Sequence, residues 1–300
     1  MYIFVLTTLY WLLYFSVTDL QIKMKQILLI LVLVFGANTI ITAQDEKIKG
    51  DRNVTIKQTY IDPFETIIVD GDFEIEIVYN SKPSVEIETD DNLHDIIQFQ
   101  VVNGTLTFAE TMRITSKKEL RITVNYGDGL KYIETRGDSE IRSLTSMELG
   151  NTVLNVLDDS RAYLNINAKN FDFKSTGRSK SRLNLTADST KVTLSDNSKL
   201  DALITSKVSD FDLYQRADAV IEGKTNRSQI RLSNSTNFTG KDFVVETSDV
   251  LLEENSDLIL AVTKSITIAA SGDSEVYLYE NPKITLTKLE GTSKLQKKER

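Results

Sequence analysis

Apolar and polar residues alternate along the second half of the chain, with apolar positions two residues apart. This period predicts half-buried β-strands and excludes helical repeats. The strands come in pairs, and between one pair and the next lies a turn that ends in a small residue. The small residues are Ser139, Ser160, Ser179, Ser198, Ala217, Ser235, Ser256, Ser274 and Ser293, at spacings of 21, 19, 19, 19, 18, 21, 18 and 19.

A fixed period of this length predicts a solenoid in which each repeat is one coil. In the coil after Ser160, the inward positions are Leu164, Ile166 and Ala168, followed by Phe171 and Phe173. One coil cannot close a core alone, so neighbouring coils must stack with their strands in parallel. Parallel crossovers are right-handed in nearly all proteins. We therefore predict an all-β, right-handed parallel β-helix with coils of about 19 residues.

The turns have their own pattern. Two residues before each small residue stand Gly137, Asp158, Gly177, Asp196, Gln215, Ser233, Glu254, Gly272 and Gly291. Glycine recurs at this position. This indicates positive φ, because glycine adopts positive φ without a steric cost. We expect the serines to face a tight corner and to bond backbone groups. They are not expected to be nucleophiles, because the one histidine, His94, offers no base beside them.

The chain before the repeats is rich in strands but irregular. It alternates at Phe73, Ile75 and Ile77, and Asn103-Gly104 is typical of a hairpin turn. Residues 44–135 are therefore either irregular first coils or a small head that caps the solenoid. Regular β-helix is expected at 136–295, and a polar tail at 296–300.

The N-terminus predicts export. Residues 24–43 have a basic start, an apolar stretch and a small residue, Ala43, at a cleavage point. Residues 1–23 then form an extension from a misassigned start codon. The alternative is two membrane spans or an anchor. A signal peptide leaves no integral membrane span in the mature chain, which would reach the periplasm, the outer membrane or the cell surface.

Composition narrows the chemistry further. A net charge of −8 argues against nucleic acid as a partner, and the lack of cysteine excludes disulfides and thiolate sites. The acidic pairs Asp90-Asp91 and Asp158-Asp159 are candidate calcium ligands, but we expect solvated turn carboxylates. His94 is expected in a polar surface loop. No metal, cofactor or catalytic residue is predicted.

One charged pattern is a candidate binding site. Directly after the small residues, successive coils place Arg161, Lys180 and Lys199 in one column. The column continues with Asp218, Thr236, Asp257 and Glu275. We hypothesise that the basic half binds an anionic glycan or a partner protein; the alternative is a solubilising edge. Outward strand positions are mixed and predict no convergent site: Tyr163, Asn165, Asn167, Arg182, Asn184, Asp201, Tyr277 and Tyr279.

Several short segments, in order, resemble one known family. They are Phe64-Glu65-Thr66-Ile67, Gly71-Asp72-Phe73-Glu74-Ile75, Asp90-Asp91-Asn92-Leu93, Val102-Asn103-Gly104-Thr105-Leu106, the strand at Leu120, Ile122 and Val124, and turns such as Gly137-Asp138-Ser139 and Gly272-Asp273-Ser274. The chain is similar from about Phe64 to Leu295 to the family called "putative auto-transporter adhesin, head GIN domain". The family's usual Gly-Ser-Gly turns are largely replaced here by Asp, Asn and Arg. The resemblance implies an exported β-helix of Gram-negative bacteria and no catalytic residues.

Three functions follow as hypotheses. The first is an exported, non-enzymatic module of the cell envelope that binds or scaffolds, such as an adhesin. The second is a carbohydrate-active β-helix enzyme of the polysaccharide lyase or hydrolase type, which a carboxylate pair in an open groove would favour. The third is a structural protein that assembles end to end. The sequence names no ligand.

Overall fold

The computed structural model describes residues 46–299, so the predicted signal peptide and the extension before it lie outside the described residues. Within 46–299 about two thirds of the residues lie in strands, and the one helix is a short 3-10 helix, η1 (Asp91–Leu93). No helix in this part of the chain has the length and apolar character to span a membrane.

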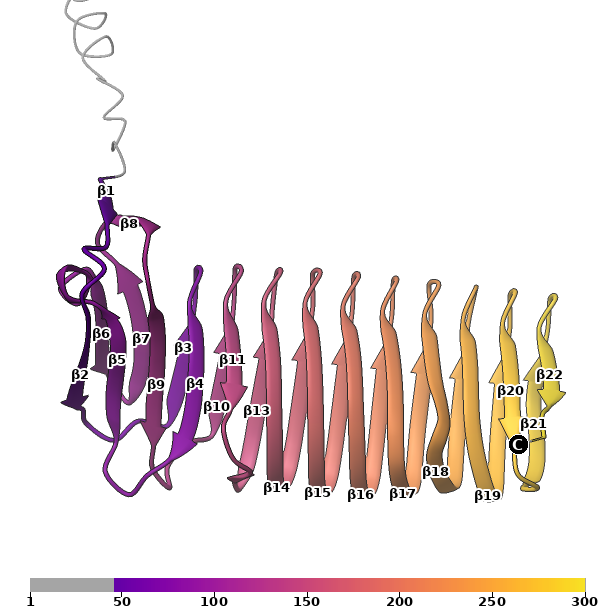
Figure 1. The fold of residues 1–300 in the computed structure, drawn as a ribbon. Helices are drawn as coiled ribbons and strands as arrows, with labels where there is room; N and C mark the ends of the chain where they lie inside the picture. The colour runs from indigo at the N-terminus through magenta and orange to yellow at the C-terminus, as the bar shows by residue number, and fades with distance from the viewer. Residues whose placement is uncertain (1–45, 300) are drawn as a thin grey trace, which may run out of the picture. The chain divides into compact units, whose positions relative to one another are not determined.

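The regular part repeats one element, a long strand followed by a tight turn (Figure 1). Four of these strands have 15 residues each: β14 (Arg161–Ser175), β15 (Lys180–Leu194), β16 (Lys199–Leu213) and β17 (Asp218–Leu232). They pair in parallel at an offset of 19 residues, as Lys180 with Lys199. The longer β18 (Asn237–Leu252) and the shorter β19 (Asp257–Ala270) continue the stack. The structure confirms the predicted parallel β-solenoid and its period.

Each long strand bends in the middle. Pairing skips Lys169, Asp188 and Lys207, and around them two successive residues face solvent instead of one. This break in the two-residue period folds each strand into two halves. The first halves form one layer of the solenoid and the second halves form the other, with the turns along one edge (Figure 1).

The core consists of columns of inward side chains. Leu164 pairs with Leu183, which pairs with Ala202, and all three are buried. Where β18 bulges, aromatic rings fill the wider interior: the Phe211 ring lies 5.0 Å from that of Phe238 and 5.8 Å from that of Phe243. The inward positions predicted from the sequence are thus the core.

The turn column has the predicted geometry, with one correction. Positive φ recurs at Gly137, Asp158, Gly177, Asp196, Gln215, Asn234, Glu254, Gly272 and Gly291. The small residues two positions later are fully buried from Ser139 to Ser274, and Ser139 Oγ donates to the Arg136 carbonyl over 2.7 Å. Ser235 was the wrong member of this column. Register places Thr236 opposite Ala217, because Asp218 pairs with Asn237, and the φ > 0 position is accordingly Asn234 instead of Ser233.

The N-terminal part contains both irregular coils and a cap. Two rungs precede the regular coils in space. One consists of β3 (Thr66–Val69) and β4 (Glu74–Tyr79), and the other of β7 (Thr105–Glu110) and β9 (Leu120–Tyr126). Because β7 pairs with β3 and β9 with β4, the coil of β7 and β9 lies between the coil of β3 and β4 and the N-terminal cap. It does so although it comes later in the sequence. On the other side of β3 and β4 lie β10 (Tyr132–Thr135) and β11 (Glu140–Ser143).

Antiparallel strands close this end. β5 (Ser84–Asp90) pairs with β9, β2 (Val54–Tyr60) pairs with β5, and β6 (Ile97–Val102) pairs with β7. The short strands β1 (Lys47–Lys49) and β8 (Arg113–Ser116) pair separately. The remaining strands are β12 (Met147–Glu148), β13 (Asn151–Val156), β20 (Glu275–Tyr279), β21 (Lys283–Leu289) and β22 (Lys294–Lys297).

Candidate ligand-binding face

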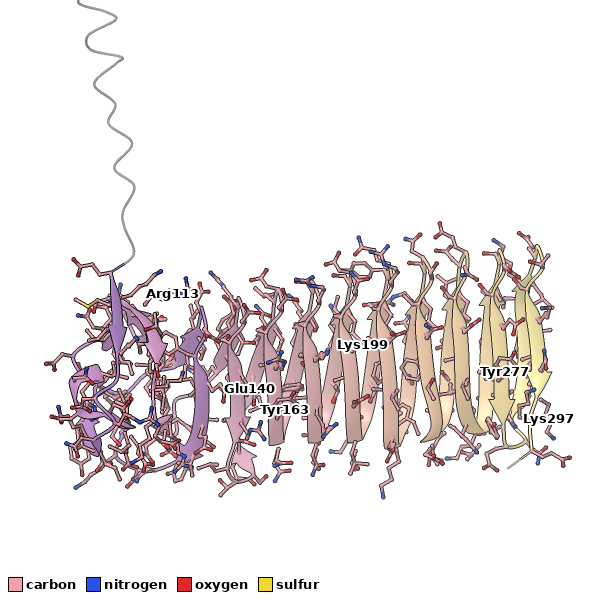
Figure 2. The ribbon with its side chains drawn as sticks, turned by 45° about the horizontal axis from the view of Figure 1, so that its top comes forward. Arg113, Glu140, Tyr163, Lys199, Tyr277 and Lys297 are labelled. Carbon is pink, nitrogen blue, oxygen red and sulfur yellow. The ribbon has the colours of Figure 1, made fainter. Side chains whose placement is uncertain are left out.

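The basic column predicted from the sequence exists. Arg161 pairs with Lys180, and Lys180 with Lys199, on the outward side of the first layer. Parallel strands hold these side chains about 4.8 Å apart. Glu140 precedes them in the column and Asp218 follows. Figure 2 shows Glu140 and Lys199 along this face, together with Tyr163 of the neighbouring column.

The acidic half of the column is also as predicted, except at one position. Asn237, and not Thr236, follows Asp218 in the column, because Asp218 pairs with Asn237. The side-chain amide of Asn237 donates a hydrogen bond to Asp218 over 2.8 Å. Asp257 and Glu275 come next. Burial, and the charge of Glu275 beside it, raise the pKa of Asp257.

A shallow groove of about 880 Å³ lies beside the basic column. Its walls are the next two outward columns. One column holds Arg142, Tyr163, Arg182, Asp201 and Val220, and the other holds Asn165, Asn184, Leu203 and Glu222. Five of the eight mixed outward positions therefore do converge on one surface, whereas Asn167, Tyr277 and Tyr279 lie outside this groove. Parallel register brings them together, since each coil contributes its equivalent side chains to the same strip.

Three cations at this site have no close partner, although the charge of Arg161, after the hydrogen bond from Arg178, helps to lower the pKa of Asp159. Within residues 46–299, the side chains of Arg161, Lys180 and Arg182 make no hydrogen bond and no ion pair. Lys199 differs, because its Nζ lies 3.7 Å from Asp218 Oδ2. Unpartnered cations side by side repel each other, and an anion that bridges them relieves this repulsion.

Arg142 and Tyr163 form one end of the groove. The Arg142 guanidinium lies 4.9 Å above the centre of the Tyr163 ring and is paired with Glu140. The hydrogen bond that Arg142 donates to Glu140 raises the pKa of Arg142. Ser143 Oγ accepts the backbone N–H of Asn165 over 2.8 Å and so fixes the next coil against β11. The arrangement presents an aromatic ring edge, amides and cations on a rigid strip.

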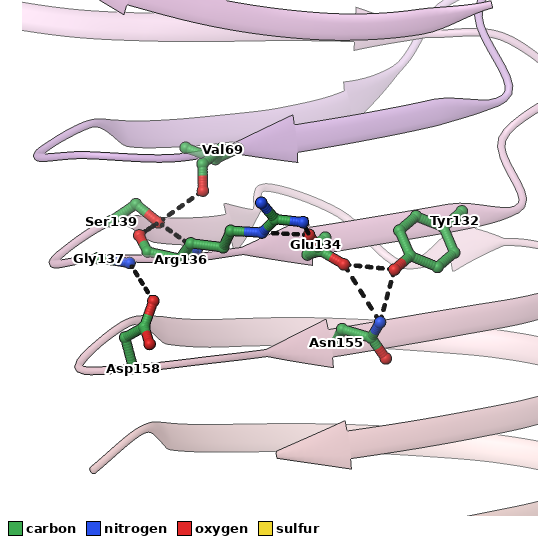
Figure 3. A network of polar contacts seen from close by, with 8 residues as sticks. All are labelled: Val69, Tyr132, Glu134, Arg136, Gly137, Ser139, Asn155 and Asp158. Carbon is green, nitrogen blue, oxygen red and sulfur yellow. Dashed lines mark hydrogen bonds and ion pairs between the residues drawn. The ribbon is translucent and has the colours of Figure 1, made fainter. Parts of the chain in front are cut away.

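A second polar cluster lies on the other layer, around Glu134 (Figure 3). Tyr132 and Arg136 donate to its carboxylate, and so does the Asn155 amide over 3.2 Å. Glu134 is only 4% exposed. Burial alone would raise its pKa, but these donors outweigh burial and lower it. Burial and the same hydrogen bond raise the pKa of Tyr132 to about 12. A carboxylate held ionised in this way is a poor general acid, so we interpret the cluster as structural.

Two expectations about polar residues were wrong. Asp90 is fully buried and accepts the backbone N–H of Lys118 over 2.9 Å, so it is not a solvated turn carboxylate. His94 is buried instead of lying in a surface loop, and its Nε2 lies 2.9 Å from Thr55 Oγ1. Burial lowers the pKa of His94. Asp90 thus connects the end of β5 to the segment before β9, and His94 connects the end of η1 to β2. Among the described residues, no group of three or more His, Cys, Asp or Glu has a metal-binding arrangement.

Arg142 was missed in the sequence. The coil after Ser139 is two residues longer than the next, because β12 and its flanking residues interrupt the strand. The signal was nevertheless present: Arg142, Tyr163 and Arg182 each stand three residues after a column serine. Counting forward from the turn, instead of scanning for alternation, would have found this part of the groove.

The geometry defines a class of protein, a β-solenoid that is capped at its N-terminal end and carries an open polar groove on one layer. The chain belongs to the family described as "Putative auto-transporter adhesin, head GIN domain", whose model matches residues 63–209 and 184–282. The two overlapping matches reflect the internal repeat.

Solved structures share the fold. A "putative adhesin" from Parabacteroides distasonis has a TM-score of 0.63 at 16% identity, over 84% of this chain and 100% of its own. Another "putative adhesin", from Parabacteroides merdae, has a TM-score of 0.58 at 16% identity, over 84% of this chain and 99% of its own. A "putative lipid binding protein" from Parabacteroides distasonis has a TM-score of 0.57 at 16% identity, over 84% and 100% of the two chains. Comparison with curated proteins gives no match.

Proposed function

We propose that this protein is an exported, non-enzymatic binding module of the Gram-negative cell envelope, and that it holds an anionic glycan along the groove of its first layer. The observation that supports this most is a set of three cations that form no hydrogen bond or ion pair within residues 46–299, beside a groove with a tyrosine and two asparagines. These cations are Arg161, Lys180 and Arg182. Family membership and the adhesin names of structural relatives agree with a binding role.

The chemistry of the groove suits an acidic sugar chain. Guanidinium and ammonium groups bind carboxylate or sulfate through charge-assisted hydrogen bonds. The amides of Asn165 and Asn184 offer both donors and acceptors to hydroxyl groups. The open, polar lining offers little cover for acyl chains, so a glycan fits it better than a lipid tail.

The test is a paired substitution with a matched control. Arg161→Gln with Lys180→Gln removes two unpartnered cations from the site. Lys174→Gln with Lys191→Gln removes the same charge from the outward side of the other layer, where both lysines are exposed. We expect the first variant to bind heparin or polygalacturonate at least about tenfold more weakly, and the control to bind like the natural protein. Lys199→Gln should have a smaller effect on binding, because Lys199 already forms an ion pair with Asp218.

The outcomes separate the alternatives. Equal loss in both variants would indicate attraction by net charge alone, and unchanged binding would leave the column as a solubilising edge. Neutral dextran serves as the negative ligand. Raising the salt concentration should weaken specific binding, because the contacts are ionic.

The enzyme alternative has one observation in its favour. Asp201 and Glu222 both line the groove, on adjacent coils. If they cleave a polysaccharide, incubation with pectate or alginate will release reducing ends or unsaturated products, and Asp201→Asn will abolish the release. Glycan binding without turnover would support the binding module.

Export is tested separately. Protease treatment of intact cells, followed by detection of the protein, distinguishes surface from periplasm. N-terminal sequencing of the recovered protein shows whether cleavage follows Ala43.

A further inference from the structure

The C-terminal end of the solenoid exposes side chains that belong to its core. On β21, Ile284 pairs with buried Ile266, and Leu286 with buried Ile268. Equivalent residues on parallel strands face the same side, so both point toward the space between the two layers. Yet Ile284 is 42% exposed and Leu286 is 48% exposed. The inner surface of the last coil is therefore open to solvent.

The same end has two open strand edges. Within the described residues, β21 pairs only with β19, and β22 only with β20. The outer edge of each strand thus presents backbone groups without a strand partner, which is a template for pairing with another chain. Natural proteins usually cover or charge such edges. Here the two strands carry Lys283, Lys288, Lys294 and Lys297, and β21 also carries exposed apolar residues.

The opposite end offers edges in the same two layers. β2 is the edge of the layer that ends in β22, and β6 is the edge of the layer that ends in β21. β6 has six residues and β21 has seven, so their lengths match. Half-buried Phe99 and Val101 of β6 pack on the core from this side.

The two ends carry opposite charge. Residues 46–131 hold ten basic and sixteen acidic residues, a net charge of −6. Residues 281–300 hold six basic and two acidic residues, a net charge of +4. Contact between two C-terminal ends would bring like charges together, whereas contact between a C-terminal and an N-terminal end would bring opposite charges together.

We infer that copies of this protein stack head to tail: the open face of β21 and β22 of one copy is covered by the capped end, with its edges β2 and β6, of the next. Such a contact is heterologous, so it leaves a free end at each side and can continue into longer rods. The inference rests on the ends of the solenoid and not on the groove, so it stands or falls separately from glycan binding.

The first experiment measures mass against concentration. The protein, in the form recovered from cells that export it, is sedimented at low and high concentration and at low and high salt. We expect the average mass to grow with concentration beyond that of a dimer, and to decrease with salt. A constant monomer mass, or growth that stops at a dimer, would overturn the inference.

The second experiment tests polarity. Ile284→Asp with Leu286→Asp places charge on the open face and should weaken self-association at least about tenfold. Val208→Asp is the control, because Val208 is also exposed, at 37%, but lies on β16 in the middle of the solenoid and outside the groove. Lys283→Gln with Lys288→Gln is a second tail variant whose exposed side chains bear little on folding; it should weaken association as well.

A mixing experiment excludes the symmetrical arrangement. The variant with Ile284→Asp and Leu286→Asp has an altered C-terminal face but an unchanged N-terminal end. A labelled sample of it should therefore bind the C-terminal end of the natural protein and shorten the assemblies. In a tail-to-tail dimer the same variant would be excluded from natural protein. Exclusion, with the variant shown to be folded by circular dichroism, would therefore contradict head-to-tail stacking.

Discussion

Single residues in the turns decide how closely the coils approach. The position with positive φ is glycine in some coils and Asp, Gln, Asn or Glu in others. Side chains rarely adopt this conformation without cost, about 1–2 kcal/mol per residue. At Gly177 the preceding turn comes close: a Cβ there would lie 2.5 Å from the Asp158 carbonyl oxygen. The close approach favours glycine at Gly177, although other coils place Asp, Gln, Asn or Glu at the equivalent position.

Gly177→Ala should lower the free energy of unfolding by about 2 kcal/mol, because the methyl group meets backbone that cannot move away easily. Gly150→Ala is the control. Its φ is not in the positive region, and no atom lies within 4 Å of the added Cβ. Urea denaturation of both variants measures the difference. Equal stability of the two would show that the turns adapt freely.

Acid should destabilise the protein partly through Glu134. Its donors, Tyr132 above all, hold its folded pKa below the unfolded value despite burial. The carboxylate therefore stabilises the fold above the unfolded pKa of about 4.3, and this contribution is lost as the pH falls through the lower, folded value.

Denaturation at pH 7, 5 and 3 measures this loss. Glu134→Gln should be less stable at pH 7 and lose less stability on acidification, because it cannot titrate. Tyr132→Phe removes one donor and should move the loss to higher pH. An identical pH profile in all three proteins would assign acid sensitivity to other groups.

At the scale of one element, each long strand bends at the same position in every regular coil. The break at Lys169, Asp188 and Lys207 sets the width of both layers. The bulge in β18 adds one residue and widens the interior, and Phe211, Phe238 and Phe243 fill it. Packing of neighbouring coils, more than any single strand, therefore supports each element.

Phe211→Ala should cost about 3–5 kcal/mol, because it leaves a cavity among rings that no neighbouring coil can fill. Phe211→Leu retains most of the volume and should cost less than half as much. Thermal unfolding of the two variants provides the comparison. A small effect of the alanine variant would mean that the bulge collapses onto the vacancy.

The sequence predicted the regular coils well but left the arrangement of the N-terminal part open, for physical reasons. Period-two alternation fixes which side chains face the core, as at Leu164 and Leu183. Register was harder to predict, because Ser235 and Thr236 both suit a corner and only strand pairing separates them. The head could not be ordered in space, since pairing of β7 with β3 leaves no periodic signal. The groove was missed because it exists only between coils.

At the scale of the whole molecule, the coils are interchangeable units. Deletion of Lys180–Ser198 removes one full repeat, because Lys180 and Lys199 occupy equivalent positions. The shortened protein should fold, with the same circular dichroism per residue and a smaller hydrodynamic radius. Deletion of Lys180–Ala187 alone removes fewer residues but breaks register, and should prevent folding. If the smaller deletion were tolerated better, stacking by register would be refuted.

The order of rungs in the head governs how the chain can be assembled. β3 and β4 leave the ribosome before β7 and β9, yet β7 and β9 must insert between them and the cap. About fifty further residues must therefore be synthesised before β7 and β9 can cover β3 and β4. Pairings between segments so far apart in the sequence are slow to form. From β13 onward each coil pairs with the coil directly before it in the chain. We therefore expect the regular coils to form faster than the head, and the distant pairings of the head to limit the rate at which the whole protein folds.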